Sequence, residues 1–287
     1  MKKTIIIFGA TDLEYVRARA IAVANGLVVA MATAPDQKSE IQKVNPFSAY
    51  KATGYEVVEG DAIGATQCII FECSPVAANG LEVVAQCDHH NPGDAGYGLG
   101  PEKSFEASSL GQLITFLGIE PTQQDRVVAA ADHCLAAAYA GKCPGVTAQE
   151  VLESRIDEIM RRDGFSDRQL AMEAIQKTLQ ILKNPPATVV LGGEVVADIR
   201  ELGKVPFTVE AGVMTGTNYL AKGGDERFPD KVNCSGSQEV IQEFLGEPVG
   251  SGRDTTYPNG WAVTNGLFNA YGDAKRGFAG AYENPQK

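Results

Sequence analysis

The amino-acid sequence predicts an α/β fold: a doubly wound, mostly parallel sheet domain, a helical connector and a smaller mixed α/β C-terminal domain. Two observations predict it. Over the first 90 or so residues, short runs rich in Ile and Val alternate with turns and helical stretches, as strands buried on both faces do. From Ala187 onward, glycines become frequent and the apolar runs shorten. We place the three parts at residues 1–146, 147–186 and 187–287.

The N-terminal domain is predicted to contain five strands: Thr4–Phe8, Leu27–Thr33, Tyr55–Val58, Cys68–Phe71 and Leu81–Ala85. A first helix over Tyr15–Asn25 is rich in alanine and arginine and stops at Gly26. Two further helices, Ala107–Leu117 and Gln124–Ala140, are also followed by glycine. In sheets of this kind ligands bind just beyond the C-terminal ends of the strands. The residues that follow each strand are therefore the candidates for function.

Two helices with capping boxes form the predicted connector. One opens at Thr147–Glu150 and the other at Ser166–Gln169, before the double proline at residues 185 and 186. The C-terminal domain is then predicted to contain three short strands and one helix. These are the strands Thr188–Leu191, Glu194–Ile199 and Pro206–Val209 and the helix Ser237–Leu245.

Composition narrows the class of protein. The 287 residues are 44% hydrophobic and 21% charged, as in ordinary globular domains, and no apolar run is long enough to span a bilayer. The six cysteines include no CxxC pair, which favours reduced thiols and a cytoplasmic location over a disulfide framework. A formal net charge of −11 without a basic run disfavours duplex nucleic acid as a partner. A small anionic substrate and a homodimer stay open, and a membrane partner is not expected.

The strongest clue to chemistry is the position of the histidines. The chain has 3 histidines, and two of them form Asp88-His89-His90 after the predicted strand Leu81–Ala85. The third, His133, follows Asp132 inside an alanine-rich helix. An Asp-His pair buried without partners costs on the order of several kcal/mol. Because carboxylates and neutral imidazoles are the usual ligands of Mn, Fe and Zn, a metal ion is one way to offset that cost.

Other strand ends supply further carboxylates. Asp12 and Glu14 follow the first strand, and Glu72 follows the strand Cys68–Phe71. Taken alone, an acid after a strand is more often a helix cap or a turn residue, and Asp12 fits that reading. Four segments, however, bring acids or histidines to one edge of the predicted sheet, and this coincidence favours a metal site.

The order of these motifs resembles the DHH phosphoesterase superfamily, which includes exonucleases, oligoribonucleases, cyclic-dinucleotide phosphodiesterases and manganese pyrophosphatases. Asp12-Leu13-Glu14 is similar to its first motif, Glu72 to its second, Asp88-His89-His90 to its third and Asp132 to its fourth. Residues 107–113 resemble its small-residue helix. The resemblance extends over residues 4–140.

The resemblance implies a role for each residue. The ligands of one or two divalent ions, typically Mn²⁺ with Mg²⁺ or another ion as alternatives, would be Asp12, Glu14, Glu72, His89 and Asp132. Glu72 would bridge the ions, and Asp88 would orient His89. His90 would meet the substrate phosphate or protonate the leaving oxygen while a hydroxide held by the metal attacks phosphorus. The implied function is hydrolysis of a small nucleotide or short oligonucleotide.

The chain departs from the family pattern at three points. Phe8 stands where the family carries a histidine, and glutamate replaces aspartate at positions 14 and 72, lengthening each ligand arm by one methylene. His133 is an imidazole that the family does not carry, and it is a candidate replacement ligand or catalytic group. A relative that binds a nucleotide or protein partner without hydrolysis is therefore the alternative.

Two unrelated functions were also weighed. A dinucleotide-binding protein would begin as Gly9-Ala10-Thr11 does, but Asp12 and Glu14 then occupy the loop that should hold a pyrophosphate. A cysteine-nucleophile hydrolase would use Cys87 or Cys134 beside the histidines, although buried thiols near acids are poorly activated.

The C-terminal domain contains a second candidate region. Residues 269–281 resemble the glycine-rich, phosphate-holding loop of the domain associated with DHH proteins, and residues 231–237 resemble the strand before it. Lys275, Arg276 and Gly277 would bind substrate phosphates through charged donors and close backbone amides. The alternative is a solvated turn.

Overall fold

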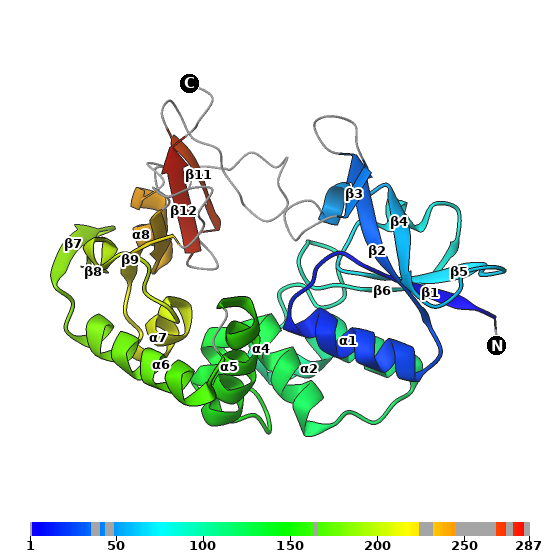
Figure 1. The fold of residues 1–287 in the computed structure, drawn as a ribbon, viewed down its shortest axis with the longest axis horizontal. Coiled ribbons are helices and arrows are strands. Elements are labelled where there is room, and N and C mark those ends of the chain that lie inside the picture. Colours follow the sequence, from blue (N-terminus) through cyan, green and yellow to red (C-terminus); the bar gives the residue numbers. More distant parts are fainter. Residues whose placement is uncertain are drawn as a thin grey trace. The chain divides into compact units, whose positions relative to one another are not determined.

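The computed structural model describes residues 2–35, 41–43, 49–163, 166–223, 232–244, 268–273 and 278–283. The chain divides into two compact units, Met1–Glu158 and Ile159–Lys287. The division falls inside helix α5 (Ala148–Asp163), within the segment that we assigned to the connector. One unit is built around a mostly parallel sheet and the other around a second, mixed sheet (Figure 1), which confirms the α/β class.

The sheet of the first unit has the strand order β3-β2-β1-β5-β6, and β4 also pairs with β2. The strands are β1 (Thr4–Phe8), β2 (Val28–Pro35), β3 (Ile41–Lys43), β4 (Gly54–Glu59), β5 (Gln67–Phe71) and β6 (Glu82–Cys87). Strands β2, β1, β5 and β6 run parallel, whereas β3 and β4 are antiparallel to β2. All five predicted strands are therefore present, with one of them antiparallel.

Alternation along β1 divides the core into two layers. Ile6 and Phe8 face α-helices α1 (Leu13–Ala24), α3 (Ser109–Leu117) and α4 (Gln123–Tyr139). Ile5 and Ile7 face two short 3-10 helices, η1 (Ala49–Lys51) and η2 (Pro75–Ala78). A doubly wound sheet would carry α-helices on both faces, so among the described residues this one is covered more thinly on its second side.

Two local signals fix the helices that flank the site. The Asp12 side chain accepts a hydrogen bond of 2.9 Å from the Tyr15 N–H and caps α1. Thr122 and Asp125 form a capping box at the start of α4. Between α1 and α4 along the chain lie η3 (Pro101–Lys103) and the single-turn helix α2 (Ser104–Ala107).

The second unit contains a sheet of order β11-β12-β10-β9-β8-β7. Its elements are α6 (Arg168–Lys183), β7 (Ala187–Leu191), β8 (Glu194–Asp198), η4 (Arg200–Leu202), α7 (Thr208–Thr215), β9 (Tyr219–Lys222), β10 (Val232–Ser235), α8 (Gln238–Phe244), β11 (Phe268–Asp273) and β12 (Phe278–Glu283). Val240 and Ile241 of α8 pack against Val196 and Leu220 of the sheet and form its core.

Two predictions for this unit are wrong. The expected strand Pro206–Val209 is the start of α7, because Phe207 adopts a left-handed backbone (φ 58°) that turns the chain into a helix. The expected glycine-rich loop at 269–281 consists largely of the antiparallel pair β11–β12, whose facing residues include Ala270 and Ala281.

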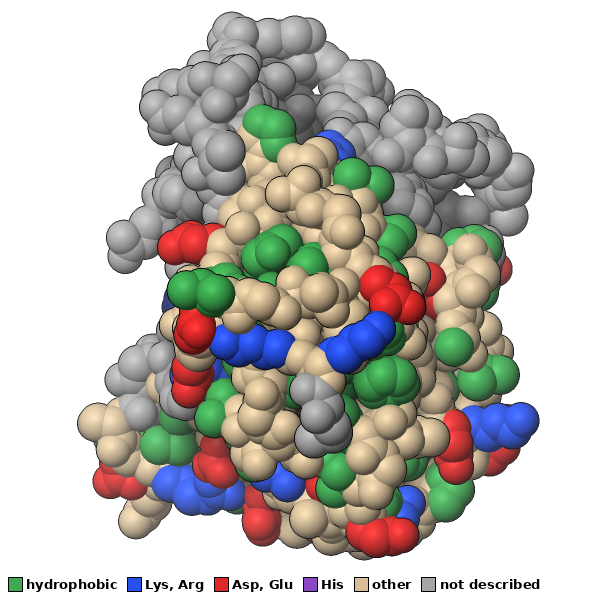
Figure 2. All heavy atoms as spheres, turned by 90° about the vertical axis from the view of Figure 1, so that its right-hand side faces the viewer, with side chains coloured by type: hydrophobic (Ala, Val, Ile, Leu, Met, Phe, Trp, Pro, Cys, Tyr) green, Lys and Arg blue, Asp and Glu red, His purple; other side chains and the backbone are tan. Residues whose placement is uncertain are grey.

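Charged side chains of both signs are visible on the described part of the face in Figure 2. On the described part of the face in Figure 2, basic side chains are interspersed with acidic ones instead of forming one stripe, and no histidine is visible. None of the helices in the described part of the chain combines the length and apolar character needed to cross a bilayer.

Candidate metal centre

The C-terminal ends of β1, β5 and β6 lie at one edge of the parallel sheet, and the chain leaves each of them with polar residues. β1 pairs with β2 on one side and β5 on the other, so this edge is the switch point where ligands bind in open α/β sheets. The backbones are closely packed there, since a Cβ on Gly9 would lie 2.0 Å from the Glu72 carbonyl oxygen. Glycine is therefore needed directly after β1.

Glu72 has an unusual backbone. Its φ of 53° lies in the left-handed region, which costs a non-glycine residue about 1–2 kcal/mol. A hydrogen bond of 3.1 Å from its N–H to the Cys87 carbonyl holds it at the edge of the sheet. Strain of this kind is retained where the surrounding structure requires it, and here it directs a buried carboxylate toward the switch point.

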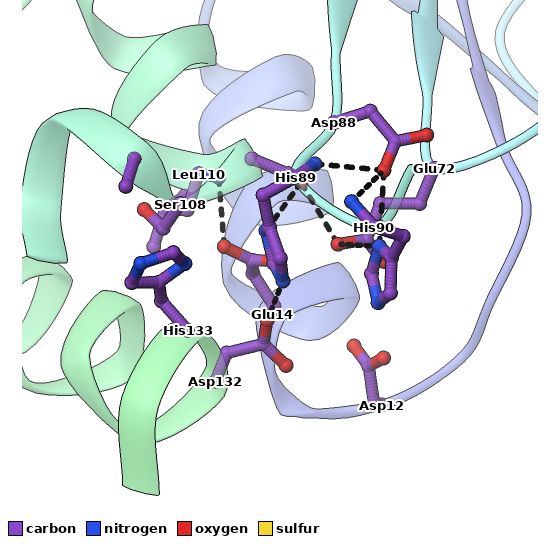
Figure 3. Close-up of polar contacts among 12 residues, drawn as sticks. Asp12, Glu14, Glu72, Asp88, His89, His90, Ser108, Leu110, Asp132 and His133 are labelled. Carbon is purple, nitrogen blue, oxygen red and sulfur yellow. Dashed lines mark hydrogen bonds and ion pairs between the residues drawn. The ribbon is translucent and has the colours of Figure 1, made fainter. Parts of the chain in front are cut away.

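Four side chains converge at this edge (Figure 3). Glu14 comes from α1, Glu72 from the end of β5, His89 from the end of β6 and Asp132 from α4. One ligand atom from each lies within 4.8 Å of the others. These four were all predicted from the sequence as metal ligands, and their carboxylate and imidazole atoms are a suitable ligand set for a divalent ion such as Mn²⁺.

Glu14 is buried beside other carboxylates. The residue is 1% exposed, and one oxygen accepts a hydrogen bond of 2.8 Å from the Leu110 N–H. Among the described residues the other oxygen, also buried, has no hydrogen-bond partner. Burial raises the pKa of Glu14 well above its usual range, and the charges of Asp132 and Glu72 raise it further. A cation in the cluster would remove this cost.

Ser109, which the sequence reasoning did not single out, determines how His89 is presented. With Glu72 ionised, the hydroxyl donates to Glu72 Oε1 at 2.8 Å and its oxygen accepts from His89 Nδ1 at 3.3 Å. In the neutral ring the proton is then on Nδ1, and Nε2 carries a lone pair. That Nε2 lies 3.3 Å from Asp132 Oδ2. Two acceptors face each other across a gap that suits a metal ion or a proton.

Asp88 organises His90. Its carboxylate accepts from Tyr50 Oη and from His90 Nδ1, both at 3.0 Å, and from the backbone N–H groups of His89 (2.8 Å) and His90 (3.1 Å). We expected Asp88 to orient the ring of His89. The ring bond shown is instead to His90, because Asp88 meets His89 through its backbone.

Gln112 of α3 holds the start of the motif in place. Its side chain accepts from the Asp88 N–H at 3.1 Å and donates to the Asp88 carbonyl at 2.9 Å. A third bond, to the Ala107 carbonyl at 2.8 Å, ties this contact to α2. Tyr50 and Gln112 carry no chemical signature in the sequence, so neither was predicted.

His90 is the positively charged group of the site. Burial lowers its pKa, but the hydrogen bond to Asp88 and the charges of Glu72 and Asp132 outweigh burial and raise the pKa to about 9. Its ring stacks on His89, with the ring centroids 4.3 Å apart. With Nδ1 bonded to Asp88, Nε2 is the atom that can face a ligand. His90, Glu72 and His89 also form a second group with ligand atoms within 4.8 Å.

Two predicted residues lie beside the four converging ligands. Asp12 caps α1, as the alternative reading held, and its charge contributes to the raised pKa of both Glu14 and Glu72. His133 packs its ring edge against His89, with centroids 5.1 Å apart, and its Nε2 donates to the Leu99 carbonyl at 2.9 Å. The buried Nδ1 of His133 has no hydrogen-bond partner within the part of the chain that the structure describes.

The third set of predicted residues cannot be placed. Lys275, Arg276 and Gly277, the predicted phosphate-binding residues, lie outside the described residues, between β11 and β12.

No protein-family model, curated protein or solved structure matches this chain.

Proposed function

We propose that the protein is a divalent-metal-dependent phosphoester hydrolase that acts on a small nucleotide or a short oligonucleotide. The observation that carries the proposal is the convergence of Glu14, Glu72, His89 and Asp132 from four distant segments. We further propose that residues 4–140 are a divergent DHH-type domain, in which η1 and η2 stand where a doubly wound sheet carries α-helices.

The four converging residues would hold the metal ion. Their oxygen and nitrogen ligands and the buried Glu14 oxygen without a partner among the described residues favour a cation, with Mn²⁺ as our choice. A bound divalent ion acts as a Lewis acid that polarises a phosphoryl oxygen and makes water more acidic. The overlapping group that includes His90 would allow a second ion only if His90 released its proton.

His90 supplies the chain's own positive charge. Protonated at neutral pH, it can donate a hydrogen bond to a phosphate oxygen or a proton to the leaving oxygen through Nε2. Asp88 holds the other ring nitrogen, and Tyr50 holds Asp88 in turn. The orientation of the donor is thus set before substrate binds, which lowers the reorganisation that the reaction requires.

A relative that binds metal and nucleotide without hydrolysis is the second candidate. Phe8, fully buried in the core, replaces the histidine of the family's first motif, and both glutamates carry a longer arm. Such a protein would bind the ion through the same four residues. It would show metal binding without turnover.

Turnover of bis-p-nitrophenyl phosphate and of short oligonucleotides with Mn²⁺ tests the proposal. His89→Ala and Asp132→Ala should each lower kcat by at least about 10³-fold, because each removes one ligand. Ser109→Ala should lower the apparent Mn²⁺ affinity about tenfold, since it acts on the ligand His89.

The matched control is Glu82→Ala. Glu82 lies on β6 at the opposite end from the site and pairs on the surface with Lys2, so its removal should leave turnover unchanged. Unchanged turnover in both ligand variants would refute the metal-site hypothesis. Mn²⁺ binding without turnover in the unmodified chain would favour the non-hydrolysing relative.

A further inference from the structure

A pair of thiols lies two residues beyond Asp132, where α4 bends. Cys134 Sγ is 3.3 Å from Cys143 Sγ, and neither is in a disulfide. Cys134 is half-buried, whereas Cys143 is 3% exposed. The remaining cysteines, Cys68, Cys73, Cys87 and Cys234, are all buried. Cys134 is therefore partly exposed to solvent and also lies next to a second thiol.

The end of α4 explains why the two sulfurs meet. Gly141 adopts a left-handed backbone with a φ of 69°. Its N–H donates to the Ala138 carbonyl at 3.0 Å, and the Lys142 N–H donates to the Ala137 carbonyl at 2.9 Å. This is the hydrogen-bond pattern of a helix that ends and reverses at glycine. The reversal returns Cys143 alongside the bend.

The two cysteines differ in backbone geometry and in burial. Cys134 interrupts α4 with non-helical backbone angles (φ −153°, ψ 59°), so it is not held by the regular helical geometry. Cys143 is a buried member of a cluster with Val146 and Val151, and Cys134 packs against the same cluster as a partly buried residue. Joining the sulfurs would shorten their separation from 3.3 Å by about 1.2 Å, to the length of a disulfide. We expect Cys134 to make most of that movement.

We propose that Cys134 and Cys143 form a reversible disulfide, and that its formation shifts Asp132 and so weakens the metal centre. Formation of the bond is independent of the proposed function, whereas its effect on metal affinity rests on that function.

The reaction is a thiol–disulfide exchange with a small disulfide such as oxidised glutathione. The Cys134 thiolate attacks one glutathione sulfur, the glutathione disulfide bond breaks, and one glutathione thiolate leaves and takes up the proton. The Cys143 thiolate then attacks the Cys134 sulfur and releases the second glutathione. Two protein thiols are oxidised and one glutathione disulfide is reduced. Burial and the neighbouring sulfur raise the pKa of Cys134 to about 12, so exchange is slow and equilibrium is the quantity to measure.

Cys134 is only two residues from Asp132, a ligand of the proposed metal centre. Asp132 immediately precedes His133, which precedes Cys134, and all three lie on α4. Asp132 Oδ2 is 3.3 Å from His89 Nε2, and the His133 ring packs against His89 at 5.1 Å between ring centroids. Metal–ligand distances tolerate only about 0.2 Å of deviation. A movement of Cys134 by an appreciable fraction of an ångström would therefore alter the position of a ligand.

The first measurement is a redox titration of the full-length chain in glutathione buffers, followed by alkylation and peptide mass mapping. We expect one peptide linkage, Cys134–Cys143, to reach about nine-tenths completion under conditions where Cys234 stays reduced. Cys143→Ser should abolish the linkage, and Cys234→Ser, a matched change outside the pair, should retain it. Absence of the linkage in the unmodified chain would overturn the proposal whether or not any variant folds.

The second measurement follows the imidazole NMR signals. The chain has 3 histidines, all in or beside the centre, so each reports on it. Oxidation should shift the His133 and His89 signals, in metal-free protein as well, and should lower Mn²⁺ affinity about tenfold. A disulfide that leaves these signals unchanged would overturn the switch. Shifted signals in a chain that binds no Mn²⁺ would retain the switch and refute the proposed function instead.

Discussion

Side chains of α1 and α4 come together at two points, each of which contains a buried carboxylate, and the surroundings of the two carboxylates differ. At one point Asp125 of α4, 2% exposed, accepts a hydrogen bond from Arg17 of α1 at 2.5 Å. At the other point Glu14 of α1 and Asp132 of α4 join Glu72 and His89, and the described residues place no Lys or Arg ion pair on Glu14 or Asp132. A buried charge must be neutralised in either case. At the first point Arg17 of the protein neutralises the carboxylate. At the second point we infer that a metal ion bound from solution neutralises the carboxylates.

The pKa values show the same contrast. Burial alone would raise the pKa of Asp125, but hydrogen bonds from Arg17 and Thr122 outweigh burial and hold the pKa below its usual range. Burial also raises the pKa of Glu14, and there the neighbouring carboxylates add to the effect. We call the Arg17–Asp125 pair the finished contact and the cluster at Glu14 and Asp132 the unfinished contact, because we infer that a bound cation would neutralise the second.

The largest expected effect comes from breaking the finished contact. Arg17→Ala leaves the buried charge of Asp125 unpaired and should lower the free energy of unfolding by about 3 kcal/mol, with or without Mn²⁺. Arg19→Ala on the same helix is the control. Its partner Glu59 is a surface group, so the loss should be below about 1 kcal/mol. Chemical denaturation measures both, and equal losses would contradict the contrast between a buried and an exposed pair.

The next expected effect is a pH dependence of the free energy of unfolding that arises from the residues of the unfinished contact. Folding raises the pKa of Glu14 and Glu72 above 4.5 and that of His90 from 6.5 to about 9. A group with a raised folded-state pKa stabilises fully below its unfolded pKa and loses that contribution as pH rises through its folded pKa. The change in the pKa of His90 alone, from 6.5 to about 9, corresponds to a loss of about 3 kcal/mol of stability in metal-free protein between pH 6.5 and 9.

Mn²⁺ should remove that loss, because the ion replaces the protons and binds more tightly as they leave. Denaturation curves at several pH values with a chelator and with Mn²⁺ provide the comparison. Metal-free stability that rises over this pH range would show that the carboxylates are already neutralised by the protein.

The smallest expected effect is the change in the free energy of unfolding when a carboxylate is replaced by an amide. Its sign should differ between the two contacts. Glu14→Gln keeps the oxygen that accepts from the Leu110 N–H and removes an uncompensated charge, so metal-free protein at pH 8 should gain about 1 kcal/mol. Asp125→Asn, the same chemical change at the finished contact, should be destabilising. Mn²⁺ should no longer stabilise the Glu14→Gln protein. Thermal unfolding with and without Mn²⁺ distinguishes these outcomes, and a loss of stability in both variants would contradict the account.

Much of the site could be predicted because parallel strands end at a common edge. Glu72 and His89 follow strands whose apolar runs are unambiguous, so their convergence follows from the topology alone. Asp132 could be predicted because a polar pair in an alanine-rich helix needs a partner. Asp12 illustrates the limit of this reasoning, since an acid after a strand can cap a helix and influence a site at once.

The rest depends on contacts that leave no pattern in the sequence. Ser109 and Tyr50 are ordinary polar residues whose roles exist only because their hydroxyls meet Glu72 and Asp88 in space. The segment at 206–209 has the apolar residues of a strand, and the left-handed turn at Phe207 made it a helix. The pair β11–β12 was missed because its glycines and alanines are typical of loops when tertiary pairing is ignored.

We propose that Glu14, Glu72, His89 and Asp132 bind one divalent ion. A crystal grown with Mn²⁺, with anomalous diffraction collected at the manganese edge, tests this directly. We predict an anomalous peak about 2.0–2.3 Å from a carboxylate oxygen of each acid and from His89 Nε2. A map without a peak at this edge of the sheet, with His89 Nε2 hydrogen-bonded directly to Asp132, would contradict it.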